Sequence, residues 1–454
     1  MTSSVGPASP SSRRQQLKIL HFSDNYPPVT GGLERAVKTL ATAQATRGDR
    51  VGVVTTTHPD LPSFAVEDGV EVHRLPTTLQ RVPKVYAQQG RVFMPPVADP
   101  LFARALKPVL AGFRPDVAHF HGWVLHSGLK PAQEHGAAVV MHAHDYGCAC
   151  ATMTLFREGD VCDGPGLARC TACSIRHYGA KGVPVTMALR ASGRRTRGID
   201  AWVALSSAVA AAGSAPRLTD RRAMTVVPSF VPDHVLAPST GPRPSFVPPH
   251  GDYLFFAGQL SAHKGTATLF EAHQRLRERG HDIHLVVAGL VKSGAPRAPD
   301  HGAVTVASDV PHDDVMRAWS HATIGAVPSA WPEPFGQVAV ECLAAGTPLV
   351  ASDIGGLRDI VVHEESGLLV PPRDPEALAD ALQRLLLDRT LAARLAANGR
   401  ARARRFSVSA VLPQIDAVYR AALSSSGSVV DHLDTQLSQP LSEDRPRPHV
   451  EVVR

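Results

Sequence analysis

Short apolar segments alternate with helical segments through both halves of this chain. In the first half, Leu17–Ser23 (LKILHFS) predicts a buried strand, Leu33–Arg47 has apolar residues at helical spacing, and Arg50–Thr55 (RVGVVT) predicts the next strand. In the second half, Tyr253–Ala257 (YLFFA) predicts a strand, and a helical segment separates it from His284–Ala288 (HLVVA). Strand, helix and strand in this order predict α/β units built on parallel sheets.

With 454 residues, the chain is long enough for two or three domains with separate cores. We expect two Rossmann-like domains between two disordered tails. The expected boundaries are a tail at 1–16, an N-terminal domain at 17–230, a C-terminal domain at 231–406, a crossover helix at 407–423 and a tail at 424–454.

The formal net charge of +6 is mild for this length, and dense runs of Lys and Arg are missing, so we expect no nucleic-acid partner. No stretch approaches the roughly 20 apolar residues that span a bilayer. The first sixteen residues lack the apolar segment of a secretory signal. We therefore expect a cytoplasmic protein. The basic group Arg194, Arg195 and Arg197 leaves peripheral contact with the inner face of the membrane as an open alternative.

Two glutamates, Glu333 and Glu341, flank a predicted corner between a strand and a helix. Thr323–Val327 (TIGAV) predicts a buried strand, and the prolines of Ser329–Pro334 (SAWPEP) predict a turn. Gly336–Ala345 (GQVAVECLAA) then predicts a helix, which a glycine closes. Glu333 is expected in the loop and Glu341 inside the helix.

The start of that helix favours an anionic or hydroxyl-rich ligand. Free backbone N–H groups and the positive end of the helix dipole lie around Phe335 and Gly336. A carboxylate close by accepts hydrogen bonds from neighbouring sugar hydroxyls. Taken alone, the two glutamates are as consistent with a structural role as with ligand binding. In the structural role, Glu341 is a solvated helix residue and Glu333 is an acid that matches the helix dipole.

The segment PEPFGQVAVECLAAGTPLVASDIGGLRDIV, followed after a short gap by SGLLVPP, resembles the E-x7-E region of a known family. That family is the large retaining nucleotide-sugar glycosyltransferase family usually called family 4, which has the GT-B fold. The resemblance extends over roughly residues 17 to 422. It implies two Rossmann-like domains facing a cleft, with the last helix crossing back to the first domain. It also implies that Glu333 contacts the donor sugar and that Glu341 binds the ribose of the nucleotide.

Lys264 lies between the predicted strand Tyr253–Ala257 and the predicted helix that follows it. The loop GQLSAHKG places Lys264 at a loop–helix junction, where a compact cation beside backbone donors suits a diphosphate. Members of the family typically have an arginine where this chain has Gln259. The departure removes one expected cation from the leaving-group site. Either Lys264 and the helix ends suffice, another arginine substitutes, or activity is reduced.

In the first half, Gly31 and Gly32 open the first predicted helix. They either make a tight turn only or let a diphosphate or acceptor approach the helix start. The resemblance favours the second interpretation, because this loop lies at the catalytic cleft in the family. His144-Asp145, after the predicted strand Ala137–Met141, resembles the family's HD pair, whose histidine points at the transferred sugar.

Further histidines end two predicted strands of the first half. Residues after strands of a parallel sheet lie at its carboxyl edge, where ligands bind in open α/β folds. His119, His121 and His142 occupy such positions. We interpret these three chiefly as structural and His144 as functional.

Five of the six cysteines fall within one short segment after the HD pair. Cys170 and Cys173 form a C-x2-C pair, a spacing that lets two thiolates grip one tetrahedral zinc ion. Cys150 and Cys162 complete a predicted four-thiolate site. In a cytosolic chain, clustered cysteines favour metal over disulfides.

Three interpretations of this segment stay open. Cys148 or His177 could substitute as a zinc ligand. Reduced thiols in an ordered loop are as well supported as zinc, and an iron–sulfur cluster is the least favoured. Zinc held by four thiolates would be structural, because no coordination position is left for catalysis. The resemblance implies that catalysis itself requires no cofactor.

The resemblance implies a retaining hexosyltransferase in glycan, glycolipid or polysaccharide synthesis. Its donor would be a UDP- or GDP-linked sugar, and its acceptor a sugar or lipid-linked hydroxyl. The expected catalytic residues are His144, Glu333 and Lys264. The expected donor-binding residues are Gly31, Gly32, Gln259, Lys264, Glu333, Phe335, Gly336 and Glu341.

Rival functions remain. A non-catalytic GT-B protein that binds nucleotide-sugars or carbohydrates is the main alternative, because Gln259 weakens the expected phosphate site. A sugar-nucleotide epimerase or a phosphorylase could use the same fold, but the E-x7-E context argues against both. A zinc-dependent nucleic-acid binder would explain the cysteines and leave the two α/β halves unexplained.

Overall fold

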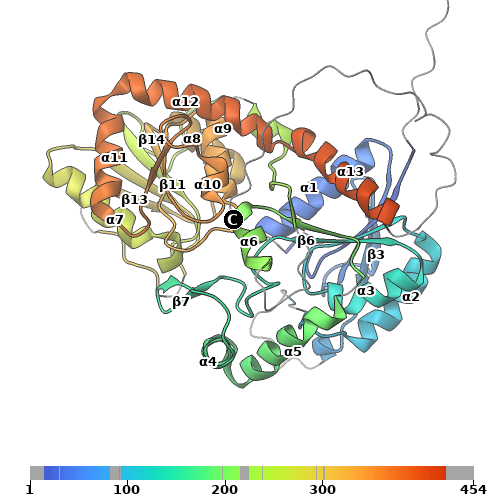
Figure 1. Ribbon diagram of the computed structural model, residues 1–454. Helices are drawn as coiled ribbons and strands as arrows, with labels where there is room; N and C mark the ends of the chain where they lie inside the picture. The colour runs from blue at the N-terminus through green and yellow to red at the C-terminus, as the bar shows by residue number, and fades with distance from the viewer. Residues whose placement is uncertain are drawn as a thin grey trace, which may run out of the picture.

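The computed structural model describes residues 15–29, 31–81, 92, 94–196, 198–214, 224–237, 239–292, 294–299 and 302–425. Most of the two predicted tails lies outside the described residues. So does Arg197 of the basic group, together with the side chains of Arg194 and Arg195. Figure 1 shows two α/β units side by side, as the sequence predicts.

The first unit is built on an eight-stranded sheet in the order β10-β9-β6-β5-β1-β2-β4-β3, in which only β3 and β4 pair antiparallel. Its strands are β1 (Lys18–Phe22), β2 (Arg50–Thr56), β3 (Phe64–Glu67), β4 (Val70–Leu75), β5 (Val117–Phe120), β6 (Ala138–Ala143), β9 (Ala201–Ala204) and β10 (Thr225–Val226). Its helices are α1 (Gly32–Thr46), α2 (Pro100–Phe113), α3 (Leu125–Glu134), α4 (Leu167–Tyr178), α5 (Gly182–Arg195) and α6 (Ser207–Gly213).

The second unit is built on a six-stranded, fully parallel sheet in the order β13-β12-β11-β14-β15-β16. Its strands are β11 (Tyr253–Ala257), β12 (His284–Ala288), β13 (Val304–Ala307), β14 (Ile324–Val327), β15 (Leu349–Ser352) and β16 (Leu368–Val370). Its helices are α7 (Thr266–Glu278), α8 (His312–His321), α9 (Gln337–Ala345), α10 (Leu357–Ile360), α11 (Pro375–Leu387) and α12 (Arg389–Ala403).

Each sheet has one point where the order of its strands reverses. The first sheet grows from β1 toward β2 on one side and from β5 toward β6 on the other, so the reversal lies between β1 and β5. In the second sheet it lies between β11 and β14. Ligands of open α/β sheets bind at such points, outside the carboxyl ends of the strands. The loops after these four strands therefore define where a site is expected.

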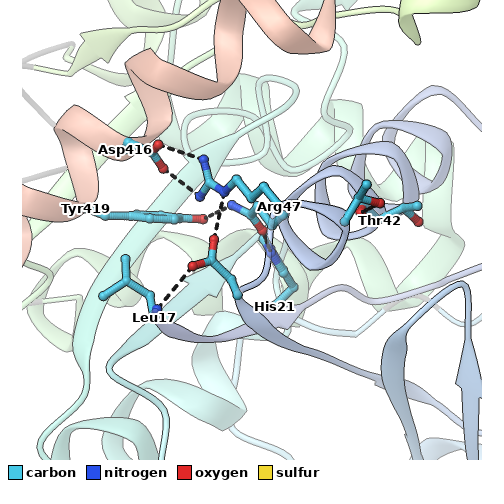
Figure 2. Close-up of polar contacts among 9 residues, drawn as sticks. Leu17, His21, Thr42, Arg47, Asp416 and Tyr419 are labelled. Carbon is cyan, nitrogen blue, oxygen red and sulfur yellow. Dashed lines mark hydrogen bonds and ion pairs between the residues drawn. The ribbon is translucent and has the colours of Figure 1, made fainter. Parts of the chain in front are cut away.

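The last helix, α13 (Val408–Ser425), leaves the second unit and packs on the first. Its apolar side chains join a core cluster with β1, β5, β6 and β9; Val411, Ile415 and Tyr419 are all buried there. The Arg47 guanidinium at the end of α1 binds the Asp416 carboxylate through two contacts of 2.6 and 2.7 Å (Figure 2). The predicted crossover helix is thus confirmed.

Several elements were not predicted, among them helices α2, α3, α5 and α8, strand β15 and two short features. Strand β3 and the hairpin of β7 (Phe156–Arg157) with β8 (Asp160–Val161) carry too few residues to give a recognisable period. Among the described residues, no helix combines the length and the apolar character that crossing a membrane needs.

Candidate functional site

A partly buried ion pair lies at the reversal point of the second sheet. Glu333, in the loop after β14, is 5% exposed, and Lys264 ends the short helix Ala262–Lys264 that follows β11. Lys264 Nζ lies 2.5 Å from Glu333 Oε1, and Ser329 Oγ donates to the same oxygen at 2.8 Å. Burial by itself raises the pKa of Glu333, but Lys264 and Ser329 together hold that pKa below its usual value. Glu333 is therefore ionised at neutral pH.

Glycines let a neighbouring loop pack directly on the backbone of Glu333. A Cβ atom at Gly355 would lie 2.4 Å from the Glu333 carbonyl oxygen, and one at Gly356 would lie 2.6 Å from that of Pro334. The Gly356 N–H donates to the Glu333 carbonyl at 2.7 Å. Gly336, with φ of 109°, then turns the chain into α9. The Gly-Gly turn after β15 thus fixes the position of the ion pair.

Glu341 lies in the second turn of α9 and is 6% exposed. His312 Nε2, from the first residue of α8, lies 3.0 Å from Glu341 Oε1. The hydrogen bond to Glu341 and its charge raise the pKa of His312. A ribose hydroxyl at Glu341 would have to share the carboxylate with this histidine or replace it. Sequence reasoning missed His312, which belongs to no motif.

The starts of α1 and α9 face each other across the two units. A Cβ atom at Gly32, the first residue of α1, would lie 3.5 Å from Oε1 of Gln337, the first residue of α9. Gln337 Nε2 donates to the carbonyl oxygen of Phe230 in the first half of the chain at 3.3 Å. Both helix starts carry free N–H groups and a positive partial charge, so their approach favours an anion. Phe335 packs its ring against Phe406, so it can offer a ligand only its backbone.

The cations of the cleft differ from the family pattern. Gln259 is exposed in the loop after β11, and its backbone carbonyl accepts from Ser261 Oγ at 3.5 Å. Arg35 is exposed near the start of α1, four residues after the N-cap Gly31. Its charge is close enough to oppose the rise in the pKa of His312. Arg35 therefore faces the second unit. Its position in the first turn of the helix after Gly31 is the sequence feature that could have identified it.

Five histidines gather at the carboxyl ends of three neighbouring strands, β1, β5 and β6. They are His21, His119, His121, His142 and His144. All are buried except His144, which is half-buried. Burial lowers the pKa of each ring, to about 4 for His21 and about 3 for His144. The five rings are therefore neutral at pH 7.

Hydrogen bonds connect three of these rings to α13. His144 Nε2 lies 2.9 Å from His121 Nδ1, and His121 Nε2 lies 2.9 Å from His21 Nδ1. His21 Nε2 lies 2.7 Å from Gln44 Oε1, and Gln44 Nε2 lies 3.1 Å from the Tyr419 hydroxyl (Figure 2). Because an amide oxygen only accepts, His21 donates from Nε2, and the other two neutral rings must then donate from Nε2 as well. With this orientation of its amide, Gln44 sets the tautomer of His144.

A cavity of about 110 Å³ opens beside His144. Its lining includes His121, His142, Asp24 and Asp145. Burial raises the pKa of Asp24 to about 7 and that of Asp145 to about 6. These carboxyls can hold or accept a proton near neutral pH. Asp24 was missed, because an aspartate after a strand is a common turn residue and no motif marks it.

The four cysteines of the predicted metal set line one cavity of about 20 Å³. They are Cys150, Cys162, Cys170 and Cys173, and their thiols are free. The two predicted substitutes lie elsewhere. Cys148 lines the cavity beside His144, and burial raises its pKa to about 12. The His177 ring packs edge-on against Tyr178.

The loops of the two units therefore offer three kinds of groups. Lys264 and two helix starts suit phosphate oxygens, while Glu333 and Glu341 suit hydroxyls. The His144 cavity adds groups from the first unit, whose residues alone line it. The predicted site residues thus come from loops of both units that meet between the sheets (Figure 1).

Two family models match this chain. Residues 30–235 match Glycosyltransferase Family 4, and residues 242–402 match Glycosyl transferases group 1. The chain is 35% identical over 195 residues to D-inositol 3-phosphate glycosyltransferase of Frankia alni. The matched region is 40% of this chain and 48% of that protein. The match thus spans about half the length of that curated relative. This chain is also 28% identical over 418 residues to glycogen synthase of Mycobacterium tuberculosis. That matched region is 85% of this chain and 90% of that protein.

Solved structures share the fold. Sucrose-phosphate synthase of Thermosynechococcus elongatus superposes with a TM-score of 0.64 at 22% identity, covering 89% of this chain and 99% of that one. HepE of Anabaena, solved in complex with UDP and glucose, superposes with a TM-score of 0.61 at 17% identity, covering 89% of this chain and 100% of that one.

Proposed function

This chain belongs to the GT-B glycosyltransferases of the family 4 and group 1 type, and from this premise we propose that it moves a sugar from a nucleotide-diphospho-sugar to an acceptor hydroxyl with retention of the anomeric configuration. The acceptor is a sugar or a lipid-linked hydroxyl, and the product serves glycan, glycolipid or polysaccharide synthesis. The second unit binds the donor and the first unit binds the acceptor.

One observation carries this proposal: Lys264 and Glu333 are in contact beside the facing starts of α1 and α9. A nucleotide-diphospho-sugar presents adjacent phosphate and hydroxyl groups, which need adjacent cationic and acceptor groups in the protein. Lys264 and the helix N–H groups bind the diphosphate. Glu333 accepts from the sugar hydroxyls, and Glu341 accepts from the ribose.

His144 completes the site from the first unit. Its neutral ring donates from Nε2 to His121, so Nδ1 can accept one hydrogen bond without placing a positive charge beside the sugar. The adjoining cavity, lined by Asp24 and Asp145, has room for part of an acceptor. Closure of the two units on the donor would exclude water and limit hydrolysis.

The proposed step keeps atoms and charges balanced without a covalent enzyme intermediate. The acceptor oxygen forms a bond to the anomeric carbon on the face from which the phosphate oxygen departs. The bond between the anomeric carbon and that phosphate oxygen breaks, and its electron pair stays on the phosphate. The leaving phosphate oxygen takes the acceptor proton. Lys264 and the helix starts stabilise the charge that develops there.

The test is donor binding followed by turnover. Thermal shifts of wild type and Glu341→Ala are measured with UDP, GDP, ADP and their glucose conjugates. At about 100 times its dissociation constant, a ligand stabilises the fold by about 2.7 kcal/mol. We expect a shift with one nucleotide class and its loss in the variant. UDP is the first choice, because HepE was solved with it. No shift with any nucleotide would refute the transferase.

Retention is tested separately from binding. The ligand that shifts the thermal midpoint is supplied with candidate sugar acceptors, and the anomeric configuration of the product is read by proton NMR. A product with the same configuration as the donor supports the mechanism. An inverted product would contradict it while leaving glycosyl transfer in place.

A non-catalytic nucleotide-sugar-binding protein is the second candidate, because the exposed and neutral Gln259 stands where the family has an arginine. Nucleotide binding with no transfer and no donor hydrolysis would favour it.

A further inference from the structure

The segment between β6 and α5 buries Tyr146, Ala149 and Ala151 near its start, but it has little hydrophobic core beyond them. Of the twelve residues of α4, all of them described, Ser174 alone is buried, while Leu167 and Ile175 are 52% and 42% exposed. Positive φ angles, which side chains other than glycine rarely adopt, occur here at Met153, Leu155 and Glu158. Burial of apolar surface does not account for the order of this segment. Small folds of this kind need disulfides or a metal, and these thiols are free.

The thiols of this segment converge from three places in the chain. Cys150 follows β6, Cys162 follows β8, and Cys170 and Cys173 lie one turn apart on the same face of α4. All four line the cavity of about 20 Å³, a volume that holds about one water-sized sphere. One ion fits this space, whereas a four-iron cluster does not.

The sulfur atoms surround the cavity more loosely than a bound ion would hold them. Among the described residues, sets of three ligand atoms within 4.8 Å of one another occur only in the histidine cluster. The cysteine sulfurs therefore need to move inward, which rotation about the Cα–Cβ bond permits. Zinc bonds to thiolates are about 2.3 Å long.

The surroundings of the cavity suit negative sulfur. Four thiolates around one zinc ion carry a net charge of about −2. Two arginines that can offset this charge, Arg157 and Arg169, line the same cavity. The Gly166 N–H donates to Cys170 Sγ at 3.4 Å. Cationic neighbours and N–H donors favour the thiolate that a metal requires.

This segment also reaches the second unit. The Arg373 guanidinium, which follows β16, donates to the Gly159 carbonyl at 2.8 Å and lies 2.6 Å from the Asp160 carboxylate. Gly159 lies in the turn of the β7–β8 hairpin and Asp160 begins β8; Figure 1 shows β7 below the second unit. Both charged side chains are exposed, so the ion pair alone contributes little. Its effect depends on a hairpin held in place by something else.

We propose that Cys150, Cys162, Cys170 and Cys173 bind one structural zinc ion. The ion fixes the segment 148–178 so that the β7–β8 hairpin braces the first unit against the second at Arg373. The brace lies outside the set of residues proposed for glycosyl transfer, and the zinc carries out no chemistry, because four thiolates fill its coordination sphere. This inference does not rest on the proposed function.

The first test measures zinc in the purified full chain by plasma mass spectrometry. We expect about one zinc per chain, as one tetrahedral thiolate site requires. Cys170→Ser and Cys173→Ser are expected to lose it. Cys148→Ser is the matched control, since this thiol lies in the same segment but lines the other cavity, and it should keep the metal. Wild type without zinc, or zinc retained in both Cys170→Ser and Cys173→Ser, would overturn the proposal.

A second test does not depend on the folding of these variants. Wild-type protein is stripped of metal and loaded with Co²⁺, and the near-ultraviolet spectrum is recorded. Coordination by cysteine gives an intense sulfur-to-cobalt charge-transfer band, which imidazole ligands lack. We expect this band in wild type and in His142→Leu. Cobalt bound without it would place the metal at the histidine cluster and refute the cysteine site.

The brace itself is tested by hydrogen exchange of the β7–β8 backbone. Arg373→Ala should keep its zinc and show faster exchange at residues 156–161, as should the metal-free wild type. Arg358→Ala is the matched control, because among the described residues the side chain of this arginine bonds to Asp353 of its own loop alone. Unchanged exchange in Arg373→Ala would refute the brace and leave the metal site standing.

Discussion

Tyr419, on the last helix, and Gln44, on the first, are joined by a buried hydrogen bond of 3.1 Å between the phenol and the amide nitrogen (Figure 2). The same phenol lies 2.7 Å from His119 Nδ1. The crossover helix thus contacts α1 and the histidine cluster of the first unit through polar groups as well as through its apolar face.

Tyr419→Phe is expected to destabilise the first unit. The change removes one oxygen and leaves the Gln44 amide and His119 without that buried partner, which costs roughly 1–3 kcal/mol. Urea unfolding measures the loss. Ser424→Ala, on the same helix, removes a hydroxyl whose partner within the described part of the chain is the Arg420 carbonyl, and it should change stability by less than about 0.5 kcal/mol. Equal effects of the two changes would contradict this account.

The tautomer of His144 should depend on Gln44. In wild type, nitrogen-15 NMR is expected to find the His144 proton on Nε2. Because Gln44 Oε1 accepts from His21 Nε2, His121 must donate to His21 and His144 must donate to His121. Gln44→Met removes the group that sets this order, so a mixture of tautomers is expected. Tyr419→Phe keeps Gln44 and should keep the single tautomer. A wild-type proton on Nδ1 would show that the amide has the opposite orientation.

His142→Leu should make the protein less sensitive to acid. Both ring nitrogens of His142 are buried, without a hydrogen-bond partner among the described residues, and burial keeps its pKa well below the usual value. The unfolded chain binds a proton below about pH 6.5 and the folded chain does not, so stability is present above that pH and falls as the pH drops. Removing the ring removes one such contribution.

The measurement compares thermal midpoints of wild type and His142→Leu at about pH 7.5 and about pH 5.5. Asp24 acts in the opposite direction, because burial raises its pKa to about 7, but it is present in both proteins and cancels in the comparison. His250→Leu, at an exposed position, is the control. An equal acid-induced drop in wild type and His142→Leu would show that His142 is not kept neutral by burial.

Much of the fold could be predicted from local pattern. Tyr253–Ala257 and His284–Ala288 are strands with the predicted bounds, since uninterrupted apolar runs mark buried parallel strands. Helix α9 ends at Gly346, whose φ of 75° is the left-handed conformation that a closing glycine predicts. The resemblance to the family assigns Lys264 and Glu333 to one donor site, and the structure brings the two side chains into contact.

The histidine chain could not be predicted in the same way. His21, Gln44, His121, His144 and Tyr419 come from five separate elements, and no sequence period relates them. Apart from His144, each is an ordinary buried polar residue when considered alone. Their connection depends on the register of β1 against β5 and on where α13 packs. Contacts that depend on tertiary packing cannot be predicted from single residues.

Gln259→Arg is expected to tighten diphosphate binding. A guanidinium restores the cation that the family has at this position, and one charge-assisted hydrogen bond contributes roughly 1.5–3 kcal/mol, about a 10- to 100-fold gain in affinity. Calorimetric titration with the nucleoside diphosphate measures it. Gln274→Arg, on the exposed face of α7, adds the same charge away from the cleft and should change little. An unchanged affinity would indicate that Arg35 or the helix starts already supply this charge.

Binding of the donor should release a proton from His312. In the free protein, the hydrogen bond to Glu341 raises the pKa of His312 above its usual value. If ribose hydroxyls replace His312 at that carboxylate, the pKa falls on binding. Donor affinity is then highest above the raised pKa, weakens as the pH drops through it, and levels off below the pKa of the bound state.

Calorimetry in two buffers with different ionisation enthalpies measures the released proton. His312→Gln keeps a group that can donate to Glu341 but cannot titrate, so its donor affinity should lose the pH dependence and its binding heat should no longer depend on the buffer. Wild-type affinity that stays constant across this range would mean that ribose does not replace His312 at Glu341. Donor binding by itself would still support the proposed transferase, so this result would move the ribose and leave the function in place.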